Sequence, residues 1–300
     1  MKPAYLIILI VLNFFWAATL SAYKVVEPYL DPGAIVTLRF GIASLSLLVL
    51  WPWLPGEAPR GHNLIKTCVM GLVVFVLGQR LQVFGNKLGT ASDSSILMAV
   101  EPLLTSIAAA IFLREHIGPR RLIGFALGMF GVALLKGVWR SDFKWLSLGA
   151  SLIFMSSFVC ETAYSIVGKP IVARASPMKV LALSLAVGTA ANLMIDGSHT
   201  LAAASRMPVQ TWLVVLGLAL ICTSFGYSFW FFVIREGDVN VAALTIFAQP
   251  VFGVALAKLW LDETLHWGQL WGSLTIVAGL VIGLSRQIRQ VPRELVTTKA

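Results

Sequence analysis

Apolar runs of about 20 residues follow one another along most of the chain, a length that matches the hydrocarbon core of a bilayer. Transmembrane β-strands would be shorter and would alternate in polarity. Of all residues, 58% are hydrophobic and only 12% are charged, so the chain has too few polar side chains to cover a water-soluble domain of this length. We therefore predict an all-α polytopic membrane protein.

The runs predict ten transmembrane helices. The first run ends in polar residues and is not followed by a small-residue cleavage site, so we expect it to stay in the mature protein and not to act as a signal peptide. The predicted helices cover residues 4–23, 33–53, 64–85, 91–113, 117–138, 145–168, 178–196, 209–233, 239–261 and 267–285.

Basic residues between the runs predict their orientation. If the N-terminus is cytoplasmic, 14 lysines and arginines fall on the inner side of the membrane and 7 on the outer side. Cytoplasmic loops carry the excess of Lys and Arg, so we expect both termini in the cytoplasm. The net charge of +9 lies mostly in these loops and the C-terminal tail, so it does not indicate nucleic acid as a partner.

The second half of the sequence repeats the first at a spacing of 148 residues. The matched pairs are Glu101-Pro102 with Gln249-Pro250, Arg114-Glu115 with Asp262-Glu263, Gly124 with Gly272, and Gly131 with Gly279. Lys24 and Lys169 also match, at a spacing of 145. In a membrane protein, an internal duplication of this kind is typical of transporters.

Each repeat holds five predicted helices, an odd number, so the second repeat enters the membrane in the opposite orientation to the first. The predicted fold is thus ten transmembrane helices arranged as two inverted five-helix repeats. We place the first repeat at residues 1–140, the second at 141–286 and a basic cytoplasmic tail at 287–300.

Of the charged side chains within the predicted helices, we select five as candidates for a functional role: Arg39, Arg80, Asp93, Glu101 and Glu161. Such groups are costly in hydrocarbon, so those that persist usually face a cavity, a partner or a transport route. At about 1.5 Å of rise per residue, Glu101 falls near the midplane and Glu161 in the cytoplasmic half. The other three fall in the outer half, where we predict a gate or outer mouth.

Each of these side chains also has a structural interpretation. Arg80 and Asp93 could form an ion pair that joins their helices on the outer side. Arg39 could extend to the outer interface along its aliphatic stem. A buried, neutral carboxyl at Glu101 could donate a hydrogen bond to a neighbouring backbone carbonyl.

Polar and aromatic side chains recur at helical spacing on several runs, which predicts a common wet interior. We expect a solute cavity there. Its predicted lining is Asn13, Trp16, Gln79, Gln82, Glu101, Glu161, Tyr164, Tyr227, Trp230 and Gln249. For Asn13, Gln79 and Gln82, the alternative is a hydrogen bond that only joins two helices.

Pro102 and Pro250 interrupt their helices near the predicted midplane and free backbone carbonyls there. We predict that both act as hinges, with a static kink as the alternative. Glycines four residues apart, such as Gly124 and Gly128, let two backbones approach closely. We therefore expect the fifth and tenth helices to form a packed scaffold away from the cavity.

Motifs of enzymes and cofactor-binding proteins are absent from the sequence. There is no nucleophile elbow, zinc-protease motif, phosphate loop or dinucleotide fingerprint. The three cysteines lack metal-ligand spacing. We expect no catalytic residue, no cofactor and no metal, and we expect uphill transport to draw on an ion gradient or on exchange.

Several motifs occur together in the first half: Trp16 to Lys24, Thr37 to Phe40, Ala91-Ser92, Glu101-Pro102, Leu113 to Glu115, Gly124 and Gly131. Together with their repeated copies, they resemble the EamA-type members of the drug/metabolite transporter superfamily over nearly the whole chain. The resemblance implies a ten-helix carrier in the bacterial inner membrane with both termini cytoplasmic. It also implies a central cavity lined mainly by the first, third, fourth, sixth, eighth and ninth helices.

Our leading hypothesis is a secondary transporter that exports a small organic solute, an amino acid or related metabolite, by alternating access. Aromatic walls with amides suit a zwitterionic or partly apolar solute. The second hypothesis is proton-coupled efflux of lipophilic cationic drugs through Glu101 and Glu161, and the third is a non-transporting membrane enzyme or assembly component. The expected partners are the solute, the lipid bilayer and protons as a candidate coupling ion, and the chain would act as a monomer or homodimer.

Overall fold

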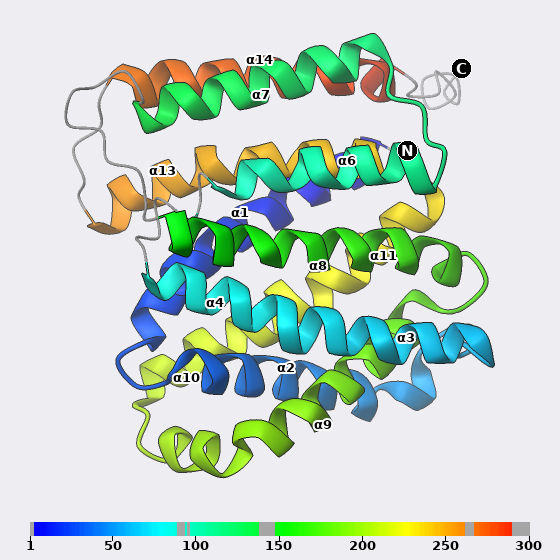
Figure 1. Cartoon of the computed structure of the whole chain (residues 1–300), viewed down its shortest axis with the longest axis vertical. Helices are drawn as coiled ribbons and strands as arrows, with labels where there is room; N and C mark the ends of the chain where they lie inside the picture. Colours follow the sequence, from blue (N-terminus) through cyan, green and yellow to red (C-terminus); the bar gives the residue numbers. More distant parts are fainter. Residues whose placement is uncertain (1–2, 89–93, 95–96, 138–147, 262–266, 290–300) are drawn as a thin grey trace, which may run out of the picture.

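The computed structural model describes residues 3–88, 94, 97–137, 148–261 and 267–289, and in them it contains helices and no strands (Figure 1). Some helices are separated only by short π- or 3₁₀-helical turns, labelled η. In chain order the elements are α1 (Pro3–Val26), α2 (Pro32–Val49), η1 (Trp51–Trp53), α3 (His62–Leu72), η2 (Val73–Gly78), α4 (Gln79–Leu88), η3 (Met98–Val100), α6 (Glu101–Phe112), α7 (Pro119–Lys136), α8 (Leu148–Val172), α9 (Pro177–Ala204), α10 (Val209–Gly217), η4 (Leu218–Phe225), α11 (Gly226–Glu236), α12 (Val239–Leu244), η5 (Thr245–Phe247), α13 (Ala248–Leu261) and α14 (Trp267–Arg289).

Within these residues, six helical stretches are long and apolar enough to cross a bilayer. They are Ala4–Val26, Pro32–Val49, His62–Leu88, Gly149–Val172, Pro177–Ala204 and Val209–Glu236. Shorter apolar helices cover Met98–Phe112, Val239–Gly253 and Leu270–Ser285. The chain is therefore a multi-pass membrane protein.

Polar side chains lie inside the bundle, while apolar side chains cover much of its surface. Asn13 and Thr223 are completely buried, whereas Ile7 and Leu45 are 67% and 63% exposed. Many other Leu, Ile, Val and Phe side chains are exposed in the same way. Because a soluble protein rarely exposes large contiguous apolar areas, this distribution fits a surface that faces lipid.

Local sequence signals set several helix ends. Asp31 caps α2 by accepting a hydrogen bond from the backbone N–H of Ala34 at 2.8 Å, and Pro32 takes the first helical position. Helix α7 begins at Pro119 and is followed by Gly137, whose φ of 66° is the left-handed conformation that glycine adopts at a helix end.

Helix α9 is longer than the sequence predicts. The predicted helix ended at residue 196, but α9 continues to Ala204 beyond a break at Asp196, whose φ of −144° is not helical. The Asp196 carboxylate accepts hydrogen bonds from Thr37 and Arg80, each at 2.7 Å. The predicted end at residue 196 thus coincides with this break, whereas the helical segment that follows it, up to Ala204, was not predicted from the sequence.

π-Helical turns interrupt two long helical stretches, η2 between α3 and α4 and η4 between α10 and α11. A π turn changes the backbone hydrogen-bond register and is frequent at functional sites. In each turn, a backbone carbonyl accepts a hydrogen bond from a side chain. Asn192 Nδ2 donates to Phe75 O at 2.8 Å, and Trp16 Nε1 donates to Cys222 O at 2.9 Å.

3₁₀ turns precede two other helices in a similar way. Turn η3 leads directly into α6 and turn η5 into α13. Pro102 and Pro250 therefore lie in the first turn of a new α-helix, where the missing N–H of proline costs no intrahelical hydrogen bond. The backbone irregularity predicted at these prolines takes the form of a 3₁₀ turn that ends at Val100, two residues before Pro102, and at Phe247, three residues before Pro250.

Helices α7 and α14 pack side by side along one edge of the bundle, at the top of Figure 1. A Cβ at Gly124 would lie 2.9 Å from the carbonyl oxygen of Gly279, and a Cβ at Gly131 would lie 2.7 Å from that of Gly272. Only glycine allows the two backbones to come this close. We call this contact the glycine seam.

Candidate functional site

A cavity of about 70 Å³ lies between α1, α2, α4, α6, α8, α11 and α13. It has room for a few water molecules. Its wall combines ionisable, amide and aromatic side chains with apolar ones. The lining residues are Trp16, Thr19, Leu20, Arg39, Gln82, Met98, Glu101, Glu161, Tyr164, Ser165, Tyr227, Trp230, Ile246 and Gln249.

Eight of the ten residues predicted to line a cavity lie in this wall. The other two, Asn13 and Gln79, stand behind it and form hydrogen bonds to lining residues. Helical periodicity indicated the correct faces of these helices, while the binding of a solute by the same residues stays a prediction.

Glu161, on α8, is held by side chains from two other helices. The Tyr227 hydroxyl donates a hydrogen bond to Glu161 Oε1 at 2.9 Å, and Gln79 Nε2 donates to the same oxygen. Gln79 Nε2 also lies 3.3 Å from the Tyr227 hydroxyl. This carboxylate is therefore fixed at the cavity wall by α4 and α11.

Arg39 lies in the same wall, and its expected place toward an outer mouth stays a prediction. Its side chain is buried, and Nε donates a hydrogen bond to Thr223 Oγ1 at 2.8 Å. One terminal nitrogen donates to the Tyr23 hydroxyl and, at 3.3 Å, to Gln79 Oε1. The alternative of an extended side chain at the membrane interface is wrong, because the guanidinium is enclosed and bonded to three other elements. The Gln79 amide thus bridges Arg39 and Glu161.

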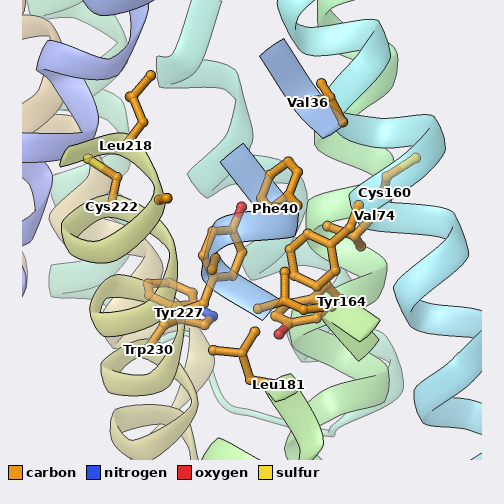
Figure 2. Close-up of a cluster of buried hydrophobic side chains, with 14 of the residues drawn as sticks. Val36, Phe40, Val74, Cys160, Tyr164, Leu181, Leu218, Cys222, Tyr227 and Trp230 are labelled. Carbon is orange, nitrogen blue, oxygen red and sulfur yellow. The ribbon is translucent and has the colours of Figure 1, made fainter. Parts of the chain in front are cut away.

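Aromatic rings form a further part of the wall. The ring centroids of Trp16 and Trp230 lie 6.1 Å apart, and those of Trp16 and Tyr227 lie 6.2 Å apart, both pairs edge to face. Trp230 Nε1 donates to Ser165 Oγ at 3.0 Å, which fixes this indole. Figure 2 shows Tyr227 and Trp230 on the same helix, across from Tyr164. Rings held in this way offer apolar surface and faces that attract cations.

Glu101 and Gln249 complete the wall from α6 and α13. Each directly precedes a proline, and the sequence repeat relates one to the other. Gln249 Nε2 donates a hydrogen bond to Asn13 Oδ1 at 2.8 Å, so the amide is anchored to α1. Glu101 and Gln249 thus place a carboxyl group and an amide in the wall of one cavity.

Arg80 forms an ion pair with a residue that the sequence analysis did not select. Its guanidinium lies 2.7 Å from Asp196 Oδ2, and Nε donates to Asn192 Oδ1 at 2.8 Å. Both partners belong to α9. Asp93 lies outside the described residues, so its role stays a prediction, while the observed contacts of Arg80 are those of a helix-joining ion pair.

A second polar cluster joins the segment after α6 to α8 and α12. Glu115 accepts hydrogen bonds from Lys169 Nζ at 2.6 Å and from the backbone N–H groups of Val239 and Asn240 at 2.8 and 3.0 Å. Asn240 Nδ2 also donates to Glu115 at 2.8 Å. The sequence had marked Glu115 and Lys169 only as repeated residues, and periodicity within one helix carries no information about this contact.

The arrangement is suited to binding a charged organic solute. Two carboxyl groups and one guanidinium meet in the described wall among indole and phenol rings. Among the described residues, no group of three or more His, Cys, Asp or Glu side chains is placed to hold a metal ion.

Comparison with known proteins identifies a family. A model of the EamA-like transporter family matches residues 3–136 and again residues 147–284. A Salmonella typhimurium protein named "Probable amino-acid metabolite efflux pump" is 27% identical over 303 residues, which cover 94% of this chain and 95% of that protein. A Bacillus subtilis protein named "Uncharacterized transporter YyaM" is 23% identical over 281 residues, covering 92% of each.

A solved crystal structure has the same fold. It superposes with a TM-score of 0.76 at 19% sequence identity and covers 97% of this chain and 100% of that chain. The family model matches twice and together the two matches span most of the sequence. The buried polar cavity, the lipid-facing surface and these matches lead to one conclusion: the chain belongs to the EamA-like transporter family.

Proposed function

We propose that the protein is a secondary transporter that exports a small organic solute, an amino acid or a related metabolite, by alternating access across the inner membrane of a bacterium. The name of the Salmonella typhimurium relative, which describes amino-acid metabolite efflux, supports the solute class. In this proposal the cavity is a solute site and the protein has no enzymatic role.

The observation that carries the proposal is the presence of Arg39 and Glu101 in one aromatic cavity. A guanidinium forms strong, directional hydrogen bonds to a carboxylate. A carboxyl group in the same wall suits an ammonium group, and the rings of Trp16 and Trp230 suit an apolar side chain. An amino acid carries all three features.

In the proposed fold, ten transmembrane helices form two inverted repeats, residues 1–140 and 141–286, followed by a cytoplasmic tail at 287–300. The double family match supports this duplication. The recurrence of a π turn and a 3₁₀ turn in each half supports it too. In the glycine seam, Gly124 meets Gly279 and Gly131 meets Gly272. A two-fold axis that exchanges the repeated glycines would relate these two contacts.

Pro102 and Pro250 are the proposed hinges, because each follows a tightened 3₁₀ turn at the cavity wall. The contact of Glu115 with Lys169 and α12 is the proposed closure on the cytoplasmic side, where both termini would lie. Protons are the proposed coupling ion, since Glu101 and Glu161 both reach the cavity. The proposal holds for a monomer or a homodimer.

Reconstituted transport tests the proposal. Purified protein in proteoliposomes is assayed for flux of a panel of radiolabelled amino acids, with Glu101→Gln as the test variant and Glu57→Gln as the matched control. Glu57 is exposed and forms an ion pair with Arg60, which is also exposed. We expect Glu101→Gln to lower flux at least tenfold without loss of folded protein. If Glu101→Gln transports amino acids at the wild-type rate at every pH tested, Glu101 has no role in transport.

Efflux of lipophilic cations is the second candidate. The wall holds two carboxyl groups against one guanidinium, and its rings offer cation-attracting faces. Dye-like cations would compete with amino acids for such a wall. Flux of a quaternary cation in the same proteoliposomes, with no flux of any amino acid, would favour this candidate over the first.

A further inference from the structure

A chain of hydrogen bonds behind the cavity fixes the orientation of the Asn13 amide. Asn13 Nδ2 donates to Leu9 O at 2.8 Å and to Thr245 Oγ1 at 3.1 Å. A backbone carbonyl can only accept, so the group that faces Leu9 O must be the nitrogen of the amide. The Thr245 hydroxyl donates in turn to Ala242 O at 2.7 Å, which leaves its oxygen free to accept from Asn13.

The same argument fixes the orientation of the Gln249 side-chain amide. Asn13 Oδ1 is the remaining acceptor of the oriented amide, so the group of Gln249 that lies 2.8 Å from it must be Nε2. Gln249 Oε1 is then an acceptor that is turned away from Asn13. It is buried and has no hydrogen-bond partner among the described residues. A buried acceptor without a donor is unfavourable, so a donor supplied by a ligand would relieve this cost.

The residue that carries this oxygen is part of the cavity wall. Gln249 and Glu101 both line the cavity, from α13 and α6. Each directly precedes its proline, so the two repeats present an amide oxygen and a carboxyl group at corresponding points. Acceptors of this kind bind an ammonium group, which carries three donors and a positive charge.

We infer that Gln249 Oε1 and the Glu101 carboxyl form a subsite for a primary ammonium group of the solute, an inference that rests on the proposed function of the cavity. Asn13 is then a positioning residue, since it sets the Gln249 amide and does not itself line the cavity. The solute class is narrowed to primary amines, including amino acids. A quaternary ammonium has no N–H to donate and cannot satisfy Gln249 Oε1.

Ligand pairs test the subsite without any mutation. Binding of leucine, isoamylamine, isoamyl-trimethylammonium and 4-methylpentanoate to the purified full chain is measured by titration calorimetry. We expect leucine and isoamylamine to bind at least tenfold more tightly than the other two, a difference of about 1.4 kcal/mol or more. Equal affinity for isoamylamine and its trimethyl analogue would overturn the subsite, and so would competition by Na⁺ that fully displaces the amines.

A variant gives the second test. Gln249→Met keeps the side-chain length but removes the acceptor, and the matched control Thr275→Val changes a hydroxyl on α14 that bonds to its own helix. We expect at least a tenfold loss of affinity for isoamylamine in Gln249→Met, and Thr275→Val within twofold of wild type. Leucine transport that survives with unchanged amine affinity in Gln249→Met refutes the subsite and leaves the proposed function standing. Absence of amino-acid binding and flux in the wild type refutes both.

Discussion

Glu115 is the side chain whose replacement we expect to weaken the packing of α8 and α12 against the segment after α6. Its carboxylate accepts four hydrogen bonds, from Lys169, Val239 and Asn240, at distances between 2.6 and 3.0 Å. The Glu115 side chain is 6% exposed and that of Lys169 is 23% exposed. In Glu115→Gln, one acceptor oxygen becomes an NH₂ group that faces donors.

The expected loss follows from these contacts. Each hydrogen bond to a charged group contributes about 1.5–3 kcal/mol to stability. The glutamine keeps only one acceptor oxygen, so about half of the four hydrogen bonds to Glu115 are lost. Lys169 regains some hydration because it is partly exposed. We therefore expect the free energy of unfolding to fall by about 3 kcal/mol, at the lower end of the roughly 3–5 kcal/mol for breaking a buried ion pair.

The assay is thermal unfolding of the purified protein in one detergent, followed by tryptophan fluorescence. Glu57→Gln is the matched control, since Glu57 and Arg60 are 74% and 82% exposed and lie 3.5 Å apart. Exposed pairs of this kind contribute about 0–1 kcal/mol. We expect Glu115→Gln to unfold several degrees below Glu57→Gln. Coincident unfolding curves for the two variants would show that the contact at Glu115 does not stabilise the protein.

Two further predictions concern the packing of the helices. Gly124→Leu inserts a side chain where even a Cβ would lie 2.9 Å from Gly279 O, so we expect overpacking to lower the free energy of unfolding by about 1–3 kcal/mol or more. The control is Gly149→Leu, because a Cβ at Gly149 would meet nothing within 4 Å. Equal thermal stability of the two variants would contradict the glycine seam. Asp196→Asn removes the ion pair with Arg80, and we expect about 1–3 kcal/mol of lost stability with flux per folded molecule unchanged. Loss of flux at full thermal stability would instead assign this pair to the transport route.

Much of the local structure could be predicted from the sequence. Apolar run length located the helices, because the bilayer fixes the length of a span. Helical periodicity then indicated which faces of α1, α8 and α11 carry Trp16, Glu161 and Tyr227 toward a common interior. Both signals are local, since each depends on residues within a few turns of one helix.

Contacts between helices could not be predicted in the same way. Arg80 was paired with Asp93 by nearness in sequence, whereas its observed partner, Asp196, lies 116 residues away. Arg39 was placed by its depth in the membrane, which gives no information about the Tyr23 and Gln79 side chains that enclose it. Such partners depend on how the helices are arranged in space, and neither periodicity nor hydropathy contains this information.

The glycine seam limits which parts of the molecule can move. Between α7 and α14, the backbone at Gly124 and Gly131 lies against the carbonyl oxygens of Gly279 and Gly272, and the Ile276 side chain packs beside Gly131, so this contact leaves little room to absorb a displacement. A small separation would open a gap too narrow for lipid or water, and the lost dispersion contacts would not be replaced. We expect these two helices to travel as a single rigid body. Deformation during a transport cycle would then be concentrated in the helices interrupted by π and 3₁₀ turns, which also supply part of the cavity wall.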